Sequence, residues 1–164
     1  MAQEHVIRFK DKHDLDLYVY DASDARIRYD TLFMGFYEKE NESDPRDIAP
    51  GKSPWDEERQ KVTMGLFPIF GGLVRLSWHD LRDNFIEYTF NFDEIFPDRI
   101  IPHPKALDDR IFWSEPLAYT PGIILEIIDR RLNIYTVIDL HVQIPNTNTV
   151  KTKTYRAKVF TREF

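Results

Sequence analysis

The sequence contains no cysteine among its 164 residues. That absence excludes a disulfide scaffold, a thiolate zinc site and a cysteine nucleophile. The chain also lacks any apolar run that approaches the length of a membrane-spanning helix, and residues 1–10 lack the apolar core of a secretory signal. If this N-terminus is the native one, we expect a cytoplasmic protein with no membrane partner.

Basic residues are too few to balance the acidic ones, and they are unevenly distributed. The formal net charge is −6 at pH 7, which argues against a nucleic acid partner for the surface as a whole. Residues 146–164 carry five basic side chains and one acidic side chain, a net charge of +4, which leaves −10 for residues 1–145. A basic segment at the end of an acidic chain fits an anionic-ligand face, or lysines that keep an edge strand from pairing with another sheet. We favour the second interpretation.

Alternation of apolar and polar residues predicts a mainly β fold. Val62–Phe92 is expected to form three consecutive antiparallel strands, the first two joined by a hairpin turn at Gly71-Gly72. A second antiparallel meander is expected over residues 122–129, 134–144 and 150–160. The predicted fold is therefore a β-sandwich or an open barrel of two antiparallel meanders with short helical turns, and α+β is the alternative.

One domain is expected to cover residues 1–164, a length that can bury a sizeable core. Two segments interrupt the strand pattern. Residues 38–61 are charged and hold three prolines, which predicts a surface loop, and residues 93–121 hold five prolines, which predicts an irregular crossover.

No sequence pattern indicates a catalytic centre, a metal or a cofactor. The chain has no phosphate-binding glycine loop, no dinucleotide fingerprint and no calcium loop of the EF-hand type. Ser77, His79 and Asp80 lie close together on one predicted strand. A triad needs the imidazole between its nucleophile and its carboxylate, however, so we interpret these residues as ordinary strand residues and predict a protein that is not an enzyme.

Two groups of residues are candidate binding sites. Trp55 stands in the charged loop, followed by Asp56, Glu57 and Glu58, and a tryptophan in a polar loop either folds back onto the core or is presented to a partner. The second group is Tyr135, Asp139 and His141, whose spacing places them on one face of a predicted strand. They are the alternative candidate, a site for a small ligand.

The stretch Gly65–Trp78 resembles a strand–Pro–Gly-Gly–strand–Trp pattern in small bacterial proteins that are encoded beside secreted toxins. Some of those proteins are suspected immunity proteins. The resemblance covers residues 65–78 only and transfers no functional residue. Many members carry a lipoprotein signal, which this sequence lacks. It implies a protein that binds another protein.

Together these observations predict a non-catalytic protein-binding module, an immunity or inhibitor protein that binds and blocks a toxin or enzyme. An acidic body suits a basic partner, because complementary charge speeds association. Two alternatives stay open: a small-ligand-binding or enzymatic β-barrel, and a structural subunit of a phage or secretion assembly. The oligomeric state stays open as well.

Overall fold

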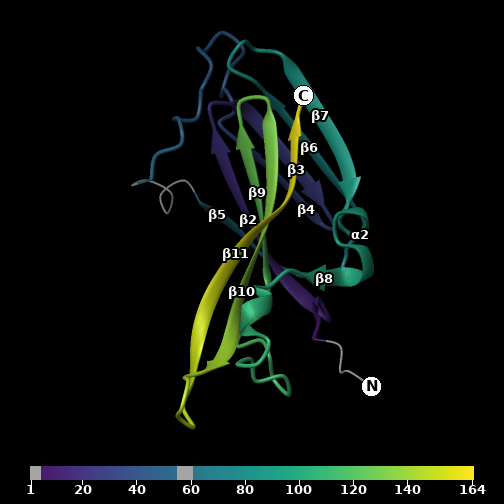
Figure 1. Ribbon diagram of the computed structural model, residues 1–164. Coiled ribbons are helices and arrows are strands. Elements are labelled where there is room, and N and C mark those ends of the chain that lie inside the picture. The colour runs from purple at the N-terminus through teal and green to yellow at the C-terminus, as the bar shows by residue number, and fades with distance from the viewer. Residues whose placement is uncertain (1–4, 55–60) are drawn as a thin grey trace.

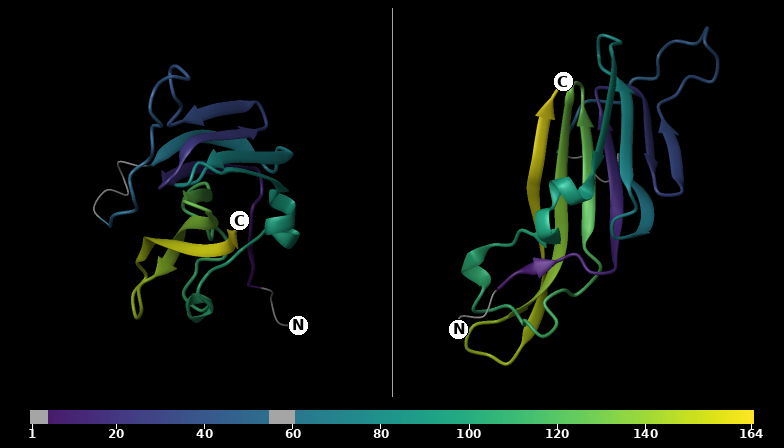
Figure 2. Two further views of the ribbon diagram at one scale, coloured as in Figure 1. Left: turned by 90° about the horizontal axis from the view of Figure 1, so that it is seen from above. Right: turned by 90° about the vertical axis from the view of Figure 1, so that its right-hand side faces the viewer.

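The fold is a sandwich of two β-sheets, described by a computed structural model over residues 5–54 and 61–164 (Figure 1). One sheet has five strands in the order β11-β10-β9-β2-β5, and the other has four in the order β4-β3-β6-β7. Figure 2 shows the two sheets stacked as layers. Neither sheet closes into a barrel within the described ranges. The prediction of a mainly β protein is confirmed.

The strands vary widely in length. Their bounds are β1 (Ile7–Arg8), β2 (Lys12–Tyr20), β3 (Ser23–Tyr29), β4 (Leu32–Phe36), β5 (Val62–Pro68), β6 (Leu73–His79), β7 (Phe85–Asn91), β8 (Ile100–Ile101), β9 (Gly122–Ile128), β10 (Arg131–Gln143) and β11 (Val150–Glu163). The two shortest, β1 and β8, pair with each other at the end of the sandwich.

The predicted hairpin at Gly71-Gly72 is wrong. β5 pairs with β2 in the five-stranded sheet, whereas β6 pairs with β3 and β7 in the four-stranded sheet. Residues 69–72 therefore carry the chain from one layer to the other. Gly72 does take a positive φ of 99°, but a corner between layers needs that freedom as much as a hairpin does. Alternation fixes which side chains share a face, and it leaves the pairing partner open.

The second meander is confirmed, because β9, β10 and β11 pair antiparallel in sequence order. β9 also pairs with β2, and that pairing is parallel, so the five-stranded sheet is mixed. A parallel pair needs a long connection, and here the connection is residues 21–121, which include the whole four-stranded sheet. β9 lies in the middle of the sheet, which explains why its apolar run is buried on both faces.

The predicted irregular crossover holds three short helical turns, α2 (Phe92–Ile95), η1 (Pro97–Arg99) and η2 (Lys105–Leu107). Asn91 begins α2, because its side-chain oxygen accepts a hydrogen bond of 3.0 Å from the Asp93 amide. In the described part of the chain, no helix is both long enough and apolar enough to cross a membrane.

Strands β3 and β6 build the core of the four-stranded sheet with every second residue. The buried members are Ala25, Ile27, Tyr29, Val74, Leu76 and Trp78. The indole Nε1 of Trp78 donates to the carbonyl of Asp129, 2.6 Å away in the β9–β10 turn. This bond ties the two layers together at one end, and each fully buried side chain of this size contributes on the order of 2 kcal/mol.

His13 lies in the aromatic part of the core with none of its surface exposed. Its Nδ1 donates to the Asp14 carbonyl at 3.0 Å, and its Nε2 lies 2.9 Å from the Tyr29 hydroxyl. The rings of Phe67, Phe70 and Phe92 surround it. Burial lowers the pKa of His13, and the bond to the Asp14 carbonyl opposes this only in part.

We predict that His13 makes the protein less stable as the solution becomes mildly acidic. The pKa of His13 in the folded chain lies below the usual value of about 6.5. Between the two pKa values the unfolded chain therefore binds a proton at His13 and the folded chain does not. The contribution of neutral His13 is full above about pH 6.5 and is lost as the pH falls toward the folded pKa. Urea unfolding from about pH 7.5 to about pH 5 measures this slope. His13→Gln should flatten it, and an unchanged slope in that variant would contradict the assignment.

Candidate functional site

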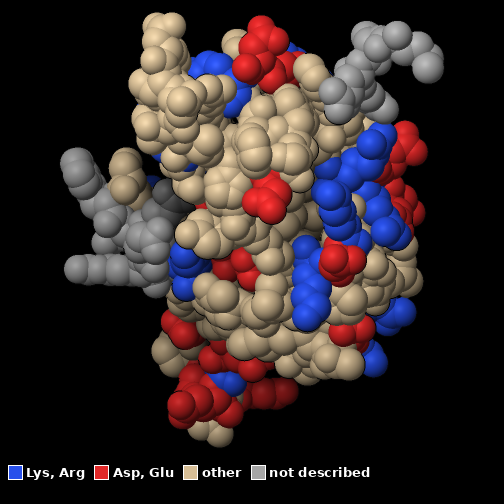
Figure 3. All heavy atoms as spheres, turned by 90° about the horizontal axis from the view of Figure 1, so that it is seen from below, with Lys and Arg blue, Asp and Glu red and all other residues tan. Residues whose placement is uncertain are grey.

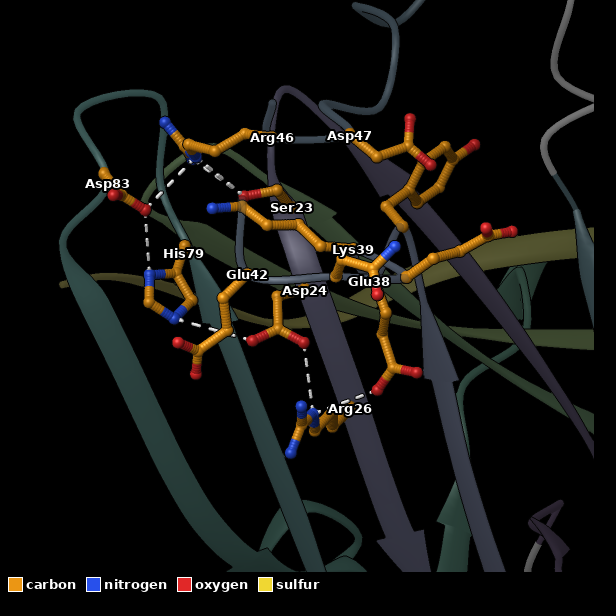
Figure 4. A pocket seen from close by; sticks show the side chains of 13 residues that line it. Ser23, Asp24, Arg26, Glu38, Lys39, Glu42, Arg46, Asp47, His79 and Asp83 are labelled. Carbon is orange, nitrogen blue, oxygen red and sulfur yellow. Dashed lines mark hydrogen bonds and ion pairs between the residues drawn. The ribbon is translucent and has the colours of Figure 1, made fainter. Parts of the chain in front are cut away.

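A pocket of about 500 Å³ opens at one end of the four-stranded sheet (Figure 4). Its lining comes from the first residues of β3, from residues 37–47 after β4, and from the end of β6 with the turn that follows. These segments are far apart in sequence, and strand pairing brings them together because Ser23 lies opposite His79.

An irregularity at the start of β3 directs Asp24 into this pocket. The register with β6 shifts between Ser23 and Arg26, and Asp24 has a positive φ of 47°. Its amide donates to the Tyr37 carbonyl at 2.9 Å, which holds the segment after β4 against the bulge. Bulges re-aim side chains in this way, and aspartate tolerates the left-handed region better than most residues.

Charged side chains and His79 form one continuous chain of close polar contacts around the pocket, in which the two links through His79 are ion pairs only when the imidazole is protonated (Figure 4). In order, its members are Glu38, Arg26, Asp24, His79, Asp83 and Arg46. The closest N···O distances between successive members are 3.1 Å, except for 3.7 Å between His79 and Asp24. Exposed pairs of this kind contribute little stability one by one. Their effect is to hold the side chains of the pocket in place.

Arg46 anchors the 37–47 segment to the sheet. Its guanidinium donates to the Ser23 hydroxyl at 2.8 Å and to the Asp80 and Leu81 carbonyls at 2.6 and 3.3 Å. The side chain is only 19% exposed. Hydrogen bonds from a charged donor are stronger than neutral ones, so Arg46 is the main fastening of this wall.

Three carboxylates of the pocket, those of Glu40, Glu42 and Asp47, form no ion pair with any described residue. The lining holds six carboxylates against Arg26, Lys39 and Arg46, a net charge of −3 when His79 is neutral. Burial, and then the charge of Asp47, raise the pKa of Tyr37 in the same wall. The pocket therefore presents a negative potential with capacity left for a cation.

The structure describes the positions of some of the sequence-based candidates and not of others. Trp55, Asp56, Glu57 and Glu58 lie outside the described residues. Residues 38–54 form neither helix nor strand, as expected of a surface loop. Part of that loop forms the pocket wall. The run of acidic residues in that loop was the available signal, but on its own it predicts no more than a surface loop.

Tyr135, Asp139 and His141 do not come together in one site. They follow one another along the outer face of β10, and each has separate partners. The Tyr135 hydroxyl donates to Glu126 at 3.2 Å, and Asp139 accepts a hydrogen bond from Thr154 on β11. His141 lines a different pocket, beside residues 113–118.

The neighbours Ser77, His79 and Asp80 do not form a triad. Asp80 is buried and accepts hydrogen bonds from the Arg82 and Asn84 amides, which closes the β6–β7 turn. Burial alone would raise the pKa of Asp80, but the hydrogen bonds from Asn84 and Arg82 outweigh it and keep that pKa below its usual value. His79 belongs instead to the acidic pocket, where sequence spacing did not place it.

Glu126 is a fully buried carboxylate in the middle of β9. It accepts hydrogen bonds from Lys52 at 2.8 Å and from Asn133 at 3.0 Å. Burial raises its pKa, but these partners outweigh burial and bring the pKa below its ordinary value. Lys52 thereby fastens the loop to the five-stranded sheet, as Arg46 fastens it to the four-stranded one. The lone acidic residue in an apolar run was the signal for this contact.

Replacing Arg46 with methionine keeps most of the side-chain stem and removes every guanidinium hydrogen bond. We expect the free energy of unfolding to fall by about 2 kcal/mol, and the amides of residues 37–47 to exchange with solvent faster than in the original protein. Urea unfolding and hydrogen exchange measure the two effects. Normal protection of that segment in Arg46→Met would contradict the anchoring role.

Glu126 should stabilise the fold only when it is ionised. Because its folded pKa is lowered, its contribution is present above the usual glutamate pKa of about 4.3 and is lost as the pH falls through the folded pKa. We expect Glu126→Gln to cost about 2 kcal/mol at neutral pH and progressively less below about pH 4. Urea unfolding of both proteins across this range gives the difference, and a constant difference would argue against an ionised Glu126.

Comparison with known proteins leaves the geometry of the pocket to carry the functional argument. No family model, no curated protein and no solved structure matches the chain. The site is therefore defined by its own chemistry, an acidic pocket built by β3, β6 and the 37–47 segment.

Proposed function

We propose that the protein is a non-catalytic, cytoplasmic binding protein that holds and blocks another protein, such as a basic toxin or enzyme. The acidic pocket takes a cationic side chain of that partner. The observation that carries the proposal is the set of three carboxylates, Glu40, Glu42 and Asp47, which have no ion pair among the described residues.

The pocket is suited to a lysine or arginine side chain. Its volume of about 500 Å³ lies within the usual range of binding pockets. Asp24 and Glu38 are already held in position by Arg26, so less side-chain freedom is lost on binding. An arginine could pair with two carboxylates at once, the geometry in which charge-assisted hydrogen bonds are strongest.

A protein partner fits the charge of the whole chain as well as that of the pocket. Residues 1–145 carry a net charge of −10, calculated from the sequence. Such a field steers a basic partner toward the pocket and raises the association rate. Covering a basic active site is the means by which an inhibitor of this kind blocks its target.

Binding of a tetra-arginine peptide, measured by calorimetry at about 0.1 M ionic strength, tests the pocket. We expect the double variant Glu40→Lys/Glu42→Lys to bind it more than about tenfold more weakly, because two attractive charges become repulsive. Tetra-glutamate should not bind at the pocket. Affinity should fall with added salt.

The matched control is Glu94→Lys/Glu115→Lys, which makes the same charge change at exposed residues outside the pocket. It should keep affinity within about twofold of the original protein, because the net charge alone has a small effect at a distance beyond the Debye length. Equal weakening in both double variants would overturn the proposed pocket. The inhibitor role requires, in addition, that a partner recovered from the host loses activity at a one-to-one ratio.

A further inference from the structure

The outer face of the four-stranded sheet continues beyond the acidic pocket and changes sign. Arg28 of β3 lies directly opposite Arg75 of β6, and both side chains are exposed. Neither guanidinium forms an ion pair or a hydrogen bond with another described residue. In the view from below, Asp and Glu gather at the lower left of the molecule, and Lys and Arg lie with other Asp and Glu along its right side (Figure 3).

Packing alone gives no reason for this pair. Like charges directly opposite each other on neighbouring strands destabilise a sheet. A threonine or a glutamate at either position would cover the same surface without repulsion. The nearby carboxylates of Asp30 and Glu87 line shallow depressions beside the two arginines but do not pair with them. Two exposed guanidiniums on directly opposed residues supply the donors that bind a carboxylate.

An apolar surface borders the arginine pair. Phe33 of β4 lies opposite Arg28 and is 69% exposed, and Leu73 of β6 is 52% exposed. Phe33, Arg28, Arg75 and Thr89 thus form one row across all four strands. Exposed aromatic residues and arginines are the residue types that contribute most binding energy in protein interfaces.

We propose that this row binds an acidic segment of a protein, with a carboxylate between Arg28 and Arg75 and an apolar side chain against Phe33. The proposal rests on the proposed function, because it assigns that segment to the same partner. Arg26 borders both the acidic pocket and the arginine pair. The face is therefore acidic at one end and basic at the other, and the partner must carry the opposite order of charges.

A peptide segment fits this row better than a nucleic acid does. A polyanion that extended from the row along the strands would meet the pocket carboxylates, which carry a net charge of −3 with their neighbours. Only two unpaired arginines would attract it, whereas non-specific nucleic acid binding needs many phosphate contacts. The exposed phenylalanine instead favours a short segment with one apolar residue among its acids.

The test uses the acidic peptide acetyl-Asp-Glu-Phe-Glu-Asp-amide, and tetra-arginine as the probe for the pocket. We expect Arg28→Thr and Arg75→Thr each to weaken binding of the acidic peptide by about tenfold, since each removes a charged hydrogen bond. Neither change should weaken tetra-arginine binding. The thermal midpoint should stay the same or rise, because each change relieves the repulsion between the arginines. Lys151→Thr, an exposed strand position on β11, is the control and should change neither affinity.

The outcomes separate this inference from the proposed function. The inference is overturned if both arginine variants bind the acidic peptide as tightly as the original protein does. If the thermal midpoint of these variants also falls, the two arginines have a structural role alone. Tighter binding of a single-stranded oligonucleotide than of the acidic peptide, lost in the same variants, overturns the choice of a peptide. If the original protein does not bind tetra-arginine, the proposed function is overturned instead.

Discussion

Alternation along β3 and β6 is the constraint on which the rest of the molecule depends. Their odd-numbered and even-numbered positions point to opposite sides, so the residues that fill the core also determine which residues face outward. Ile27 and Leu76 are buried, and Arg28 and Arg75 are therefore exposed and opposed across the pair. A shift of one residue in register would bury the arginines. Core and outer face cannot change independently.

The segment after β4 converts a flat sheet end into a pocket. Arg46 fastens this segment to the four-stranded sheet, and Lys52 fastens it to the five-stranded sheet through Glu126. Each fastening is a charged group that donates hydrogen bonds to a buried or half-buried partner, and such charge-assisted hydrogen bonds are stronger than neutral ones. The acidic side chains between them gain a defined position without any helix or strand of their own.

Side-chain alternation was sufficient to predict strands within residues 62–92 and the meander of β9, β10 and β11, and charge and proline content predicted the irregular nature of residues 38–54. Alternation could not predict that β5 pairs with β2 and not with β6, because both pairings satisfy the same pattern of apolar residues. The pocket could not be predicted from the sequence for a similar reason. Asp24, Arg46 and His79 come from three separate segments, and only the strand register and a bulge bring them together. Glu126 was visible as an acid in an apolar run, but its partner Lys52 lies 74 residues away.

Amide chemical-shift mapping by NMR, with tetra-arginine added to the original protein, tests the central claim most directly. The account predicts that the shifted amides cluster in residues 23–26, 37–47 and 79–83, the segments that line the acidic pocket. Saturation should be reached with one set of sites. Shifts centred on β10 and β11, or spread evenly over the acidic surface, would contradict a pocket for a cationic side chain of a partner.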